Sequence, residues 1–375
     1  MRRTLGYNRA LDGLRAAAVA VVICDHAGLP AIGTYGVVVF FVISGYLITG
    51  LLLAEHGSTG TLSIGAFYRR RFARLAPALL LVVGVTLGWV LGIGLAVSNW
   101  IAGLVGALTY TTDFIEQTAL QPHISTYFEW SWSLAIEEQF YLVWPVLMIV
   151  LLAFGGRWGR TWLASFAGAV VVLAWVSRAD MAGVQSAQQQ ISFAFRTHMD
   201  AIALGAILAI VTAGRAFGRL ARHVAGTLAV VAFVTLGVLM DGSLKILPLY
   251  SGDARGYGQV ALLCLVIVAG LVITPGGLLA RFLGWGPFVH LGRLSYGLYL
   301  WNMLFMNGFN QLFGHKPIDA GWAGLLWLLA LVGTAEASYR WVETPLRKRW
   351  AHRPEPATQP AASGTSVAPR LVPAR

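Results

Sequence analysis

The chain has 375 residues, of which 57% are hydrophobic and only 11% are charged, with a formal net charge of +11. Soluble domains carry about 25% charged residues, so this composition excludes an ordinary soluble protein and indicates a polytopic membrane protein. The positive charge lies in short clusters between apolar segments, which is typical of cytoplasmic loops and argues against a nucleic-acid-binding surface.

Apolar runs of spanning length recur along the chain and predict an all-α transmembrane bundle of about ten helices. The predicted spans are 11–29, 35–54, 76–97, 132–153, 162–177, 198–213, 222–240, 257–273, 292–313 and 320–341. If the N-terminus lies in the cytoplasm, the outer loops hold five basic residues: Arg178, Arg196, Lys245, Arg255 and Lys316. This asymmetry predicts that both termini are cytoplasmic.

Only one large domain is expected. Residues 1–349 hold all the apolar runs, whereas residues 350–375 are rich in Pro, Ala and Ser. That composition predicts a disordered cytoplasmic tail after a single transmembrane domain.

The first predicted span carries ionisable side chains that hydrocarbon disfavours. Arg15 and His26 are eleven residues apart, which is about three turns and ~16 Å, so both share one helix face. Neutral imidazole accepts a proton from a hydroxyl near pH 7, which makes His26 a candidate base. A polar contact between helices explains the pair equally well. Asp25 projects about 100° away, so the helix does not require it to pair with His26.

Two candidate elements follow in the next spans. The Ser44-Gly45 dipeptide permits close helix packing, and packing is its favoured interpretation on its own. Arg70, Arg71 and Arg74 form an R-R-x-x-R pattern, in which 70 and 74 share a helix face with 71 beside them. Arginine binds phosphate oxygens in pairs, which suits an anion with several phosphates. Composition alone favours a topology signal at the lipid headgroups.

The fourth span opens with paired acids, Glu137 and Glu138, flanked by Trp132 and Tyr141. Acids at a helix start can simply favour the helix dipole. Aromatic faces stack on sugar rings, although they also anchor helices at membrane interfaces. This segment therefore predicts a polar site at a membrane entry.

Polar residues also occur in two later spans. Arg196 and Asp200 stand at i, i+4 and can pair with each other, whereas His198 is expected to be incidental. The late segment 292–302 offers Tyr299 and Asn302 as further polar groups.

Together these segments resemble the acyltransferase-3 family of integral membrane acyltransferases. The matching segments, in the family's order, are LDGLRAAAVAVVICDH, GVVVFFVISGYLIT, FYRRRFARLAP, WSLAIEEQFYLVWP, RTHMDAIALGAILA, LGRLSYGLYLW and ETPLRKR. The chain departs from the pattern twice. Val38 stands where the second motif commonly has Asp, and Asn302 stands where the late motif usually has His. Asparagine forms hydrogen bonds but cannot serve as a base near pH 7.

The resemblance implies transfer of an acyl group, which we expect to be acetyl, from cytoplasmic acyl-CoA to a hydroxyl of a cell-surface or exported glycan. A macrolide-like secondary metabolite is the alternative acceptor. From the resemblance and the residue chemistry together we assign three sets of residues: catalytic His26, Arg15, Glu137 and Ser44; donor-binding Arg70, Arg71 and Arg74; and substrate-binding Asp25, Trp132, Glu138, Tyr141, Arg196, Asp200, Tyr299 and Asn302.

Acyl transfer to a hydroxyl needs a base, an anion site for the donor's phosphates and stabilisation of the oxyanion. The hypothesis is a polar channel in which acyl-CoA passes Arg15 and presents its thioester to His26, with Ser44 a candidate covalent carrier. The expected partners are acyl-CoA, the acceptor and the lipid bilayer, without metal or nucleic acid, in a bacterial cytoplasmic (inner) membrane. A transporter that exports a glycan or lipid without chemistry is the alternative of a different class.

Overall fold

The computed structural model describes residues 6–118, 120, 126–181, 194–241 and 254–351. Its long helices are α1 (Arg9–Ala27), α2 (Gly33–Thr59), α3 (Ile64–Gly92), α6 (Ser131–Phe154), α7 (Gly159–Met181), α9 (Phe195–Thr212), α10 (Arg219–Met240), α11 (Ala254–Ile273), α13 (Gly286–Phe313) and α14 (Trp322–Ser338). Each predicted span overlaps one of these helices, and the all-α class is confirmed. In the described ranges, extended pairing is limited to one isolated bridge, Ala31 with Asp241.

Seven of the described helices are long and apolar enough to cross a membrane: α2, α3, α6, α7, α9, α10 and α11. Three others fall short for identifiable reasons. α1 carries Asp12, Arg15 and Asp25 near its centre and ends, and α14 has only 17 residues. α13 is long enough, but polar residues such as Asn302 dilute its apolar stretch. Ten crossings and cytoplasmic termini therefore remain predictions.

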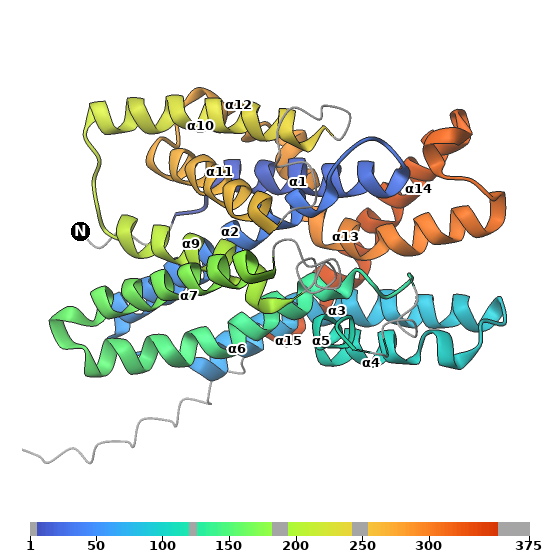
Figure 1. The fold of residues 1–375 in the computed structure, drawn as a ribbon, viewed down its shortest axis with the longest axis horizontal. Coiled ribbons are helices and arrows are strands. Elements are labelled where there is room, and N and C mark those ends of the chain that lie inside the picture. The colour runs from blue at the N-terminus through green and yellow to red at the C-terminus, as the bar shows by residue number, and fades with distance from the viewer. Residues whose placement is uncertain (1–5, 119, 121–125, 182–193, 242–253, 352–375) are drawn as a thin grey trace, which may run out of the picture.

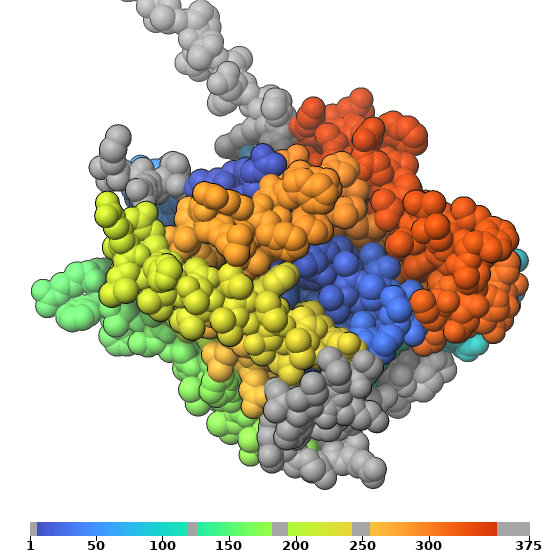
Figure 2. Space-filling view, turned by 90° about the horizontal axis from the view of Figure 1, so that it is seen from above, coloured from blue at the N-terminus to red at the C-terminus, as the bar shows by residue number. Residues whose placement is uncertain are grey.

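The two N-terminal helices occupy the middle of the bundle. Figure 1 shows α6, α7, α9, α10 and α11 toward one end of the longest axis and α3, α4, α13 and α14 toward the other, with α1 and α2 between them. α2 packs on α9, and α1 packs on both α13 and α2. In Figure 2 the blue surface of the N-terminal helices lies between the yellow α10 and the orange-red C-terminal helices.

A glycine contact brings α2 and α9 together. A Cβ added at Gly45 would lie 1.9 Å from the carbonyl oxygen of Ile202, and one added at Gly205 would lie 2.1 Å from that of Val42. Because each glycine faces the other helix's backbone, the two helices approach more closely than larger side chains permit. The packing interpretation of Ser44-Gly45 is therefore confirmed, and it also fixes where the neighbouring Ser44 lies.

The segment between α3 and α6 contains structure that the sequence pattern did not predict. It forms a 3-10 turn (Val97–Asn99), α4 (Ile101–Thr109) and the short α5 (Thr112–Ile115). Tyr110 joins α4 to α5 in a left-handed conformation, with φ 55°. α4 and α5 both pack against α6, and the amide of Gln139 donates to the carbonyl oxygen of Tyr110 at 3.1 Å. The segment therefore folds back onto α6.

The remaining elements lie in the C-terminal third. α12 (Leu278–Leu283) precedes α13, and a 3-10 turn (Pro317–Ala320) precedes α14. α14 continues through a π-helical turn, η7 (Tyr339–Glu343), into α15 (Thr344–Ala351). α15 packs on α3, where the ring of Trp350 stacks on Phe72 with centroids 5.5 Å apart. This contact makes residues 350 and 351 helical rather than the start of a tail. The rest of the predicted tail, 352–375, lies outside the described residues.

We expect Gly45→Leu to disrupt the α2–α9 contact. The added side chain would meet backbone rather than a movable side chain, and overpacking of a core costs about 1–3 kcal/mol or more. The measurement is the thermal unfolding midpoint of the purified protein in detergent. Gly84→Leu is the matched control, because a Cβ at Gly84 of α3 meets nothing within 4 Å. Equal midpoints for the two variants would contradict the close approach.

Candidate active site

Three of the four residues assigned as catalytic lie close together where α1, α2 and α6 approach. The hydroxyl of Ser44 donates to Oε1 of Glu137 at 2.7 Å. Arg15 is near enough to Glu137 to interact with it electrostatically, and its guanidinium also lies 3.9 Å from Asp12. Arg15 is largely buried, with 14% of its side chain exposed. The Glu137 carboxylate thus lies near both the Ser44 hydroxyl and the Arg15 guanidinium.

Arg71 fastens α3 to α6. Its Nε lies 2.9 Å from each carboxylate oxygen of Glu138, and its Nη2 also donates to that carboxylate. The guanidinium carbon lies 3.4 Å from the ring centroid of Tyr141, which adds a cation–π contact. Glu138 thus neutralises Arg71, and a paired fork of this kind is strong and directional.

The R-R-x-x-R arginines do not converge on one ligand position. Arg70 is 53% exposed and pairs with Glu55 of α2 at 3.2 Å. Arg71 pairs with Glu138, and Arg74 lines a cavity. In the structure Glu55 therefore holds the long Arg70 side chain away from the cavity that Arg74 lines.

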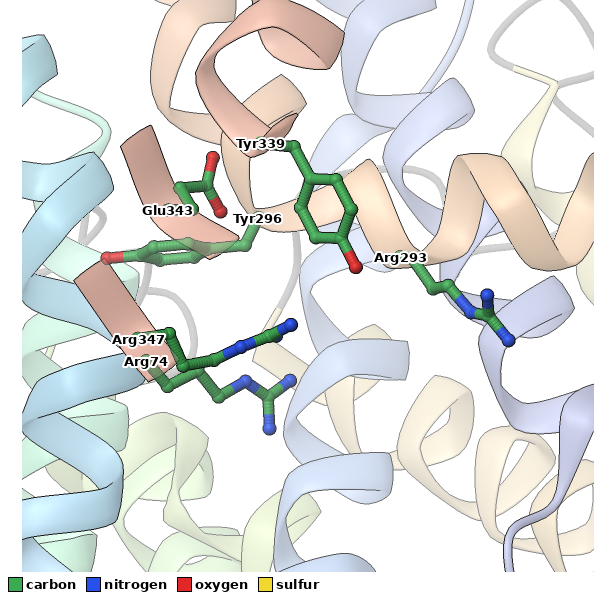
Figure 3. A pocket seen from close by; sticks show the side chains of 6 residues that line it. All are labelled: Arg74, Arg293, Tyr296, Tyr339, Glu343 and Arg347. Atoms are coloured by element: carbon green, nitrogen blue, oxygen red, sulfur yellow. The ribbon is translucent and has the colours of Figure 1, made fainter. Parts of the chain in front are cut away.

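A polar cavity of about 200 Å³ lies between α3, α13, η7 and α15. Arg74 and Arg347 extend side by side along it, with Arg293 beyond Tyr339 (Figure 3). The full lining is Arg74, Arg293, Tyr296, Tyr339, Glu343 and Arg347. The residue-level prediction missed all of these except Arg74. Their signal was present, since the segments LGRLSYGLYLW and ETPLRKR contain four of them.

His26 lies near the opposite end of α1 and contacts α13. Its Nδ1 is 2.5 Å from the side-chain amide of Asn302. Neighbouring Asp25 instead accepts from the backbone N–H of Gly33 at 3.1 Å, at the start of α2. Asp25 and Lys316 are both near enough to act on His26 electrostatically. Asn302 is thus the direct partner of His26, while Asp25 satisfies a helix terminus.

Two other predicted substrate residues take part in interhelical contacts. The Tyr299 hydroxyl lies 2.6 Å from the Ser133 hydroxyl and donates to the Trp130 carbonyl at 3.0 Å. The Trp132 ring lies 5.3 Å from the ring of His198, between centroids. His198 is buried, and aromatic rings of several helices pack around it.

Asp200 has its strong partner on another helix. Arg178 of α7 reaches both its oxygens, at 3.0 and 2.5 Å, and Trp175 donates to it at 2.9 Å. The sequence analysis offered Arg196 as the partner of Asp200 and did not predict the pairing with Arg178. Arg178 was predicted to lie in an outer loop, but α7 continues past it to Met181 and both members of the pair are buried. Loss of one partner would leave a buried charge, so the pair holds α7 against α9.

Two buried carboxyls outside the predicted spans were not anticipated. Asp113 accepts from Gln139 at 2.8 Å, and one oxygen of Asp113 and one of Glu116 are buried without a hydrogen-bond partner among the described residues. Burial raises the pKa of Asp113 to about 6. Burial, with a smaller contribution from nearby Glu129, raises the pKa of Glu116 to about 7.

The described residues contain no group of three or more His, Cys, Asp or Glu side chains placed to hold a metal ion. The described site contains the Ser44–Glu137 pair, the His26 imidazole in contact with Asn302, and the arginine-lined cavity.

Comparison with known proteins places this arrangement in context. A family model described as an acyltransferase domain (acyltransferase 3) matches residues 8–335. O-acetyltransferase OatA of Staphylococcus aureus strain NCTC 8325 / PS 47 is 30% identical over 373 residues, covering 92% of this chain and 58% of the relative. Putative O-acetyltransferase SAS0844 of strain MSSA476 is 29% identical, with the same coverage. The chain thus spans little more than half the length of these relatives. No solved structure gives a significant match.

We expect the stability of the protein to fall as pH rises from about 4 to about 7. A carboxyl with a raised pKa in the fold binds its proton more tightly than in the unfolded chain, so its contribution is complete below the unfolded pKa. That contribution is lost as pH rises through about 6 for Asp113 and about 7 for Glu116. Unfolding midpoints across this range measure it. Asp113→Asn with Glu116→Gln should flatten the slope and raise the midpoint at pH 7.5, and an unchanged slope would contradict the assignment.

Proposed function

This chain belongs to the acyltransferase-3 family, and we propose that it is a membrane O-acyltransferase. In this proposal it moves an acetyl group from cytoplasmic acyl-CoA to a hydroxyl of a cell-surface or exported glycan. The names of the staphylococcal relatives support the acetyl group and the oxygen acceptor. One observation carries the proposal: α1 holds Arg15 near Glu137, which is hydrogen-bonded to Ser44, and holds His26 against Asn302.

The two ends of α1 take different parts of the reaction in this proposal. Arg15 and His26 are about 16 Å apart along the helix. Arg15 belongs to the end where the arginines of α3 gather, which suits an anionic donor. The pantetheine arm of acyl-CoA is long enough to bridge much of that distance. The thioester then arrives near His26 while the phosphates stay at the arginine end.

His26 acts as the base that takes the proton from the acceptor hydroxyl. An imidazole can do so through Nε2 when Nδ1 carries the ring proton. In the structure the side-chain NH2 of Asn302 faces Nδ1, and the amide oxygen is buried without a partner among the described residues. A half-turn of the amide group would present that oxygen to Nδ1–H. Asn302 then holds the ring and its tautomer. It performs that positioning with an amide where relatives usually have His.

Glu137, Ser44 and Arg15 form the polar wall that the donor passes. The Ser44 hydroxyl is hydrogen-bonded to Glu137, which can take its proton, so Ser44 is the candidate for a covalent acyl carrier. In an alternative route the thioester stops at Ser44, toward the Arg15 end of α1. The acyl group then moves to the Ser44 oxygen, the thiolate of CoA leaves and the proton of Ser44 passes to Glu137. Direct transfer to the acceptor needs no such step.

The seven apolar helices support a multi-pass membrane protein. The bacterial relatives support a bacterial cytoplasmic membrane, and the clustered arginines support cytoplasmic termini. The proposed partners are therefore acyl-CoA on the inner side, a glycan hydroxyl on the outer side and the surrounding lipid.

The test of the base is His26→Ala in purified protein supplied with radiolabelled acetyl-CoA and glycan extract. Loss of a general base lowers kcat by about 10²–10⁴-fold, while donor binding is retained. The readouts are release of free CoA and labelled acceptor. His56→Ala, near the end of α2, is the control. Wild-type turnover by His26→Ala, or no turnover by the wild type with any acyl-CoA, would defeat the proposal and favour a transporter.

The role of Asn302 has its own test. Asn302→Ala removes the group that holds the ring, so kcat should fall at least tenfold with the donor KM unchanged. Asn302→Asp should recover much of the loss, because a carboxylate also accepts from Nδ1–H. Asn307→Ala is the matched control, since Asn307 is on the same helix and donates to the carbonyl of Thr126. Equal losses in the Ala and Asp variants would point to a purely structural contact.

A further inference from the structure

The polar cavity brings three arginines together from three separate elements. Arg74 comes from α3, Arg293 from α13 and Arg347 from α15 (Figure 3). Glu343 is the one carboxylate among the lining residues, and it accepts a hydrogen bond from Ser338 at 3.0 Å. Three cations against one anion leave the lining with an excess of positive charge. This excess of positive charge favours the binding of an anion.

Two arginines close to the cavity in the chain have carboxylate partners outside it, whereas inside the cavity the nearby charge of Glu343 acts on Arg74 and Arg347. Arg71 pairs with Glu138, and Arg340 pairs with Glu336. Within the described part of the chain, no carboxylate lies at ion-pair distance from Arg74, Arg293 or Arg347.

Two further contacts bear on these cavity cations. Arg293 donates to the hydroxyl of Tyr7 at 3.0 Å, which leaves its other N–H groups available. Arg74 is repelled by Arg15 and Arg71, and it is attracted by Glu137 and Glu343. A bound anion would relieve that repulsion.

We propose that this cavity binds the phosphate groups of the donor's nucleotide end, with Arg293 and Arg347 joining Arg74 as phosphate ligands. The proposal rests on the acyl-CoA donor proposed above. The planar guanidinium binds phosphate oxygens in pairs, which three converging arginines can do from different sides. A cavity of about 200 Å³ is smaller than the 300–1,000 Å³ typical of whole-ligand pockets. It therefore suits a diphosphate, with the rest of the donor extending toward Arg15.

The proposal changes the roles of two predicted donor residues. Arg71 is the positioning residue that joins α3 to α6 through Glu138, and Arg70 is held by Glu55. In this proposal η7 and α15 form one side of the donor site. α15 contacts α3 where the ring of Trp350 stacks on that of Phe72. π-helical turns often occur at functional sites, and this one carries Tyr339 and Glu343 of the cavity lining.

The experiment compares two donors with the full-length purified protein in neutral detergent. Acetyl-CoA carries the phosphates, and S-acetyl-pantetheine carries the same thioester without them. Arg293→Gln and Arg347→Gln should each raise the KM for acetyl-CoA at least tenfold, with kcat little changed. Their KM for S-acetyl-pantetheine should equal that of the wild type. Arg347→Lys keeps the positive charge but cannot donate two parallel hydrogen bonds, so its KM for acetyl-CoA should be intermediate.

Arg340→Gln is the matched control, because Arg340 lies in η7 but pairs with Glu336 and is exposed. It should leave both KM values unchanged. If the wild type turns over acetyl-CoA and the cavity variants match it, the phosphate subsite is wrong while the proposed function stands. A rise in KM for both donors would also overturn the subsite, since it would indicate a general structural defect.

A binding measurement keeps the subsite testable without turnover and separates two sources of phosphate. Inorganic pyrophosphate should raise the thermal midpoint of the wild type and not that of the Arg293→Gln, Arg347→Gln double variant. Phosphatidylglycerol in mixed micelles should have the same effect on both proteins. Stabilisation of the wild type alone by phosphatidylglycerol, with none by pyrophosphate, would make the cavity a lipid-headgroup site and overturn the donor subsite.

Discussion

Charge buried among apolar helices is the constraint on which the rest of this structure depends. A charged side chain in a bundle of this composition is costly unless a partner neutralises it. Arg71 with Glu138 and Arg178 with Asp200 meet that requirement, and each pair joins two separate helices. The same pairs fix the relative positions of α3 and α6 and of α7 and α9. The bundle is held in register by polar contacts as well as by apolar packing.

The backbone contacts between small residues work with these polar pairs. Gly45 and Gly205 let α2 and α9 approach to backbone distance, which places Ser44 at a defined depth. Ser44 then meets Glu137 of α6, one residue before the glutamate that holds Arg71. Adjacent acids on one helix thus have separate tasks. Glu138 pairs with Arg71, while Glu137 accepts from the Ser44 hydroxyl and lies near Arg15, which suits the role proposed for it.

The two ends of α1 illustrate how separate sites share one element. Arg15 lies among the groups contributed by α2, α3 and α6, and His26 lies against Asn302 of α13. Neither site is complete on α1 alone. The proposed reaction uses the length of the helix, with an anionic donor at one end and the acceptor hydroxyl at the other. A cavity of unpaired arginines at the donor end is consistent with that division.

Much of the helical fold was predictable from hydropathy alone, because spanning helices must be long and apolar and therefore leave a strong local signal. The packing role of Gly45 was also within reach, since it depends on a short motif. Local patterning failed where the partner is distant. It paired Asp200 with Arg196 rather than with Arg178, and it treated the α4–α5 segment as an interruption.

The sequence by itself determined the helical class, the order of the helices and the kinds of side chain available for the proposed acyl transfer. Only the tertiary structure decided which of those side chains act together. Arg70, Arg71 and Arg74 are neighbours in the chain, yet Glu55, Glu138 and the cavity separate them. Arg293 and Arg347 are distant in the chain, yet they line the same cavity as Arg74. The reason is physical: Arg70 and Arg71 turn toward carboxylates on other helices, and helix packing alone brings Arg74 together with Arg293 and Arg347.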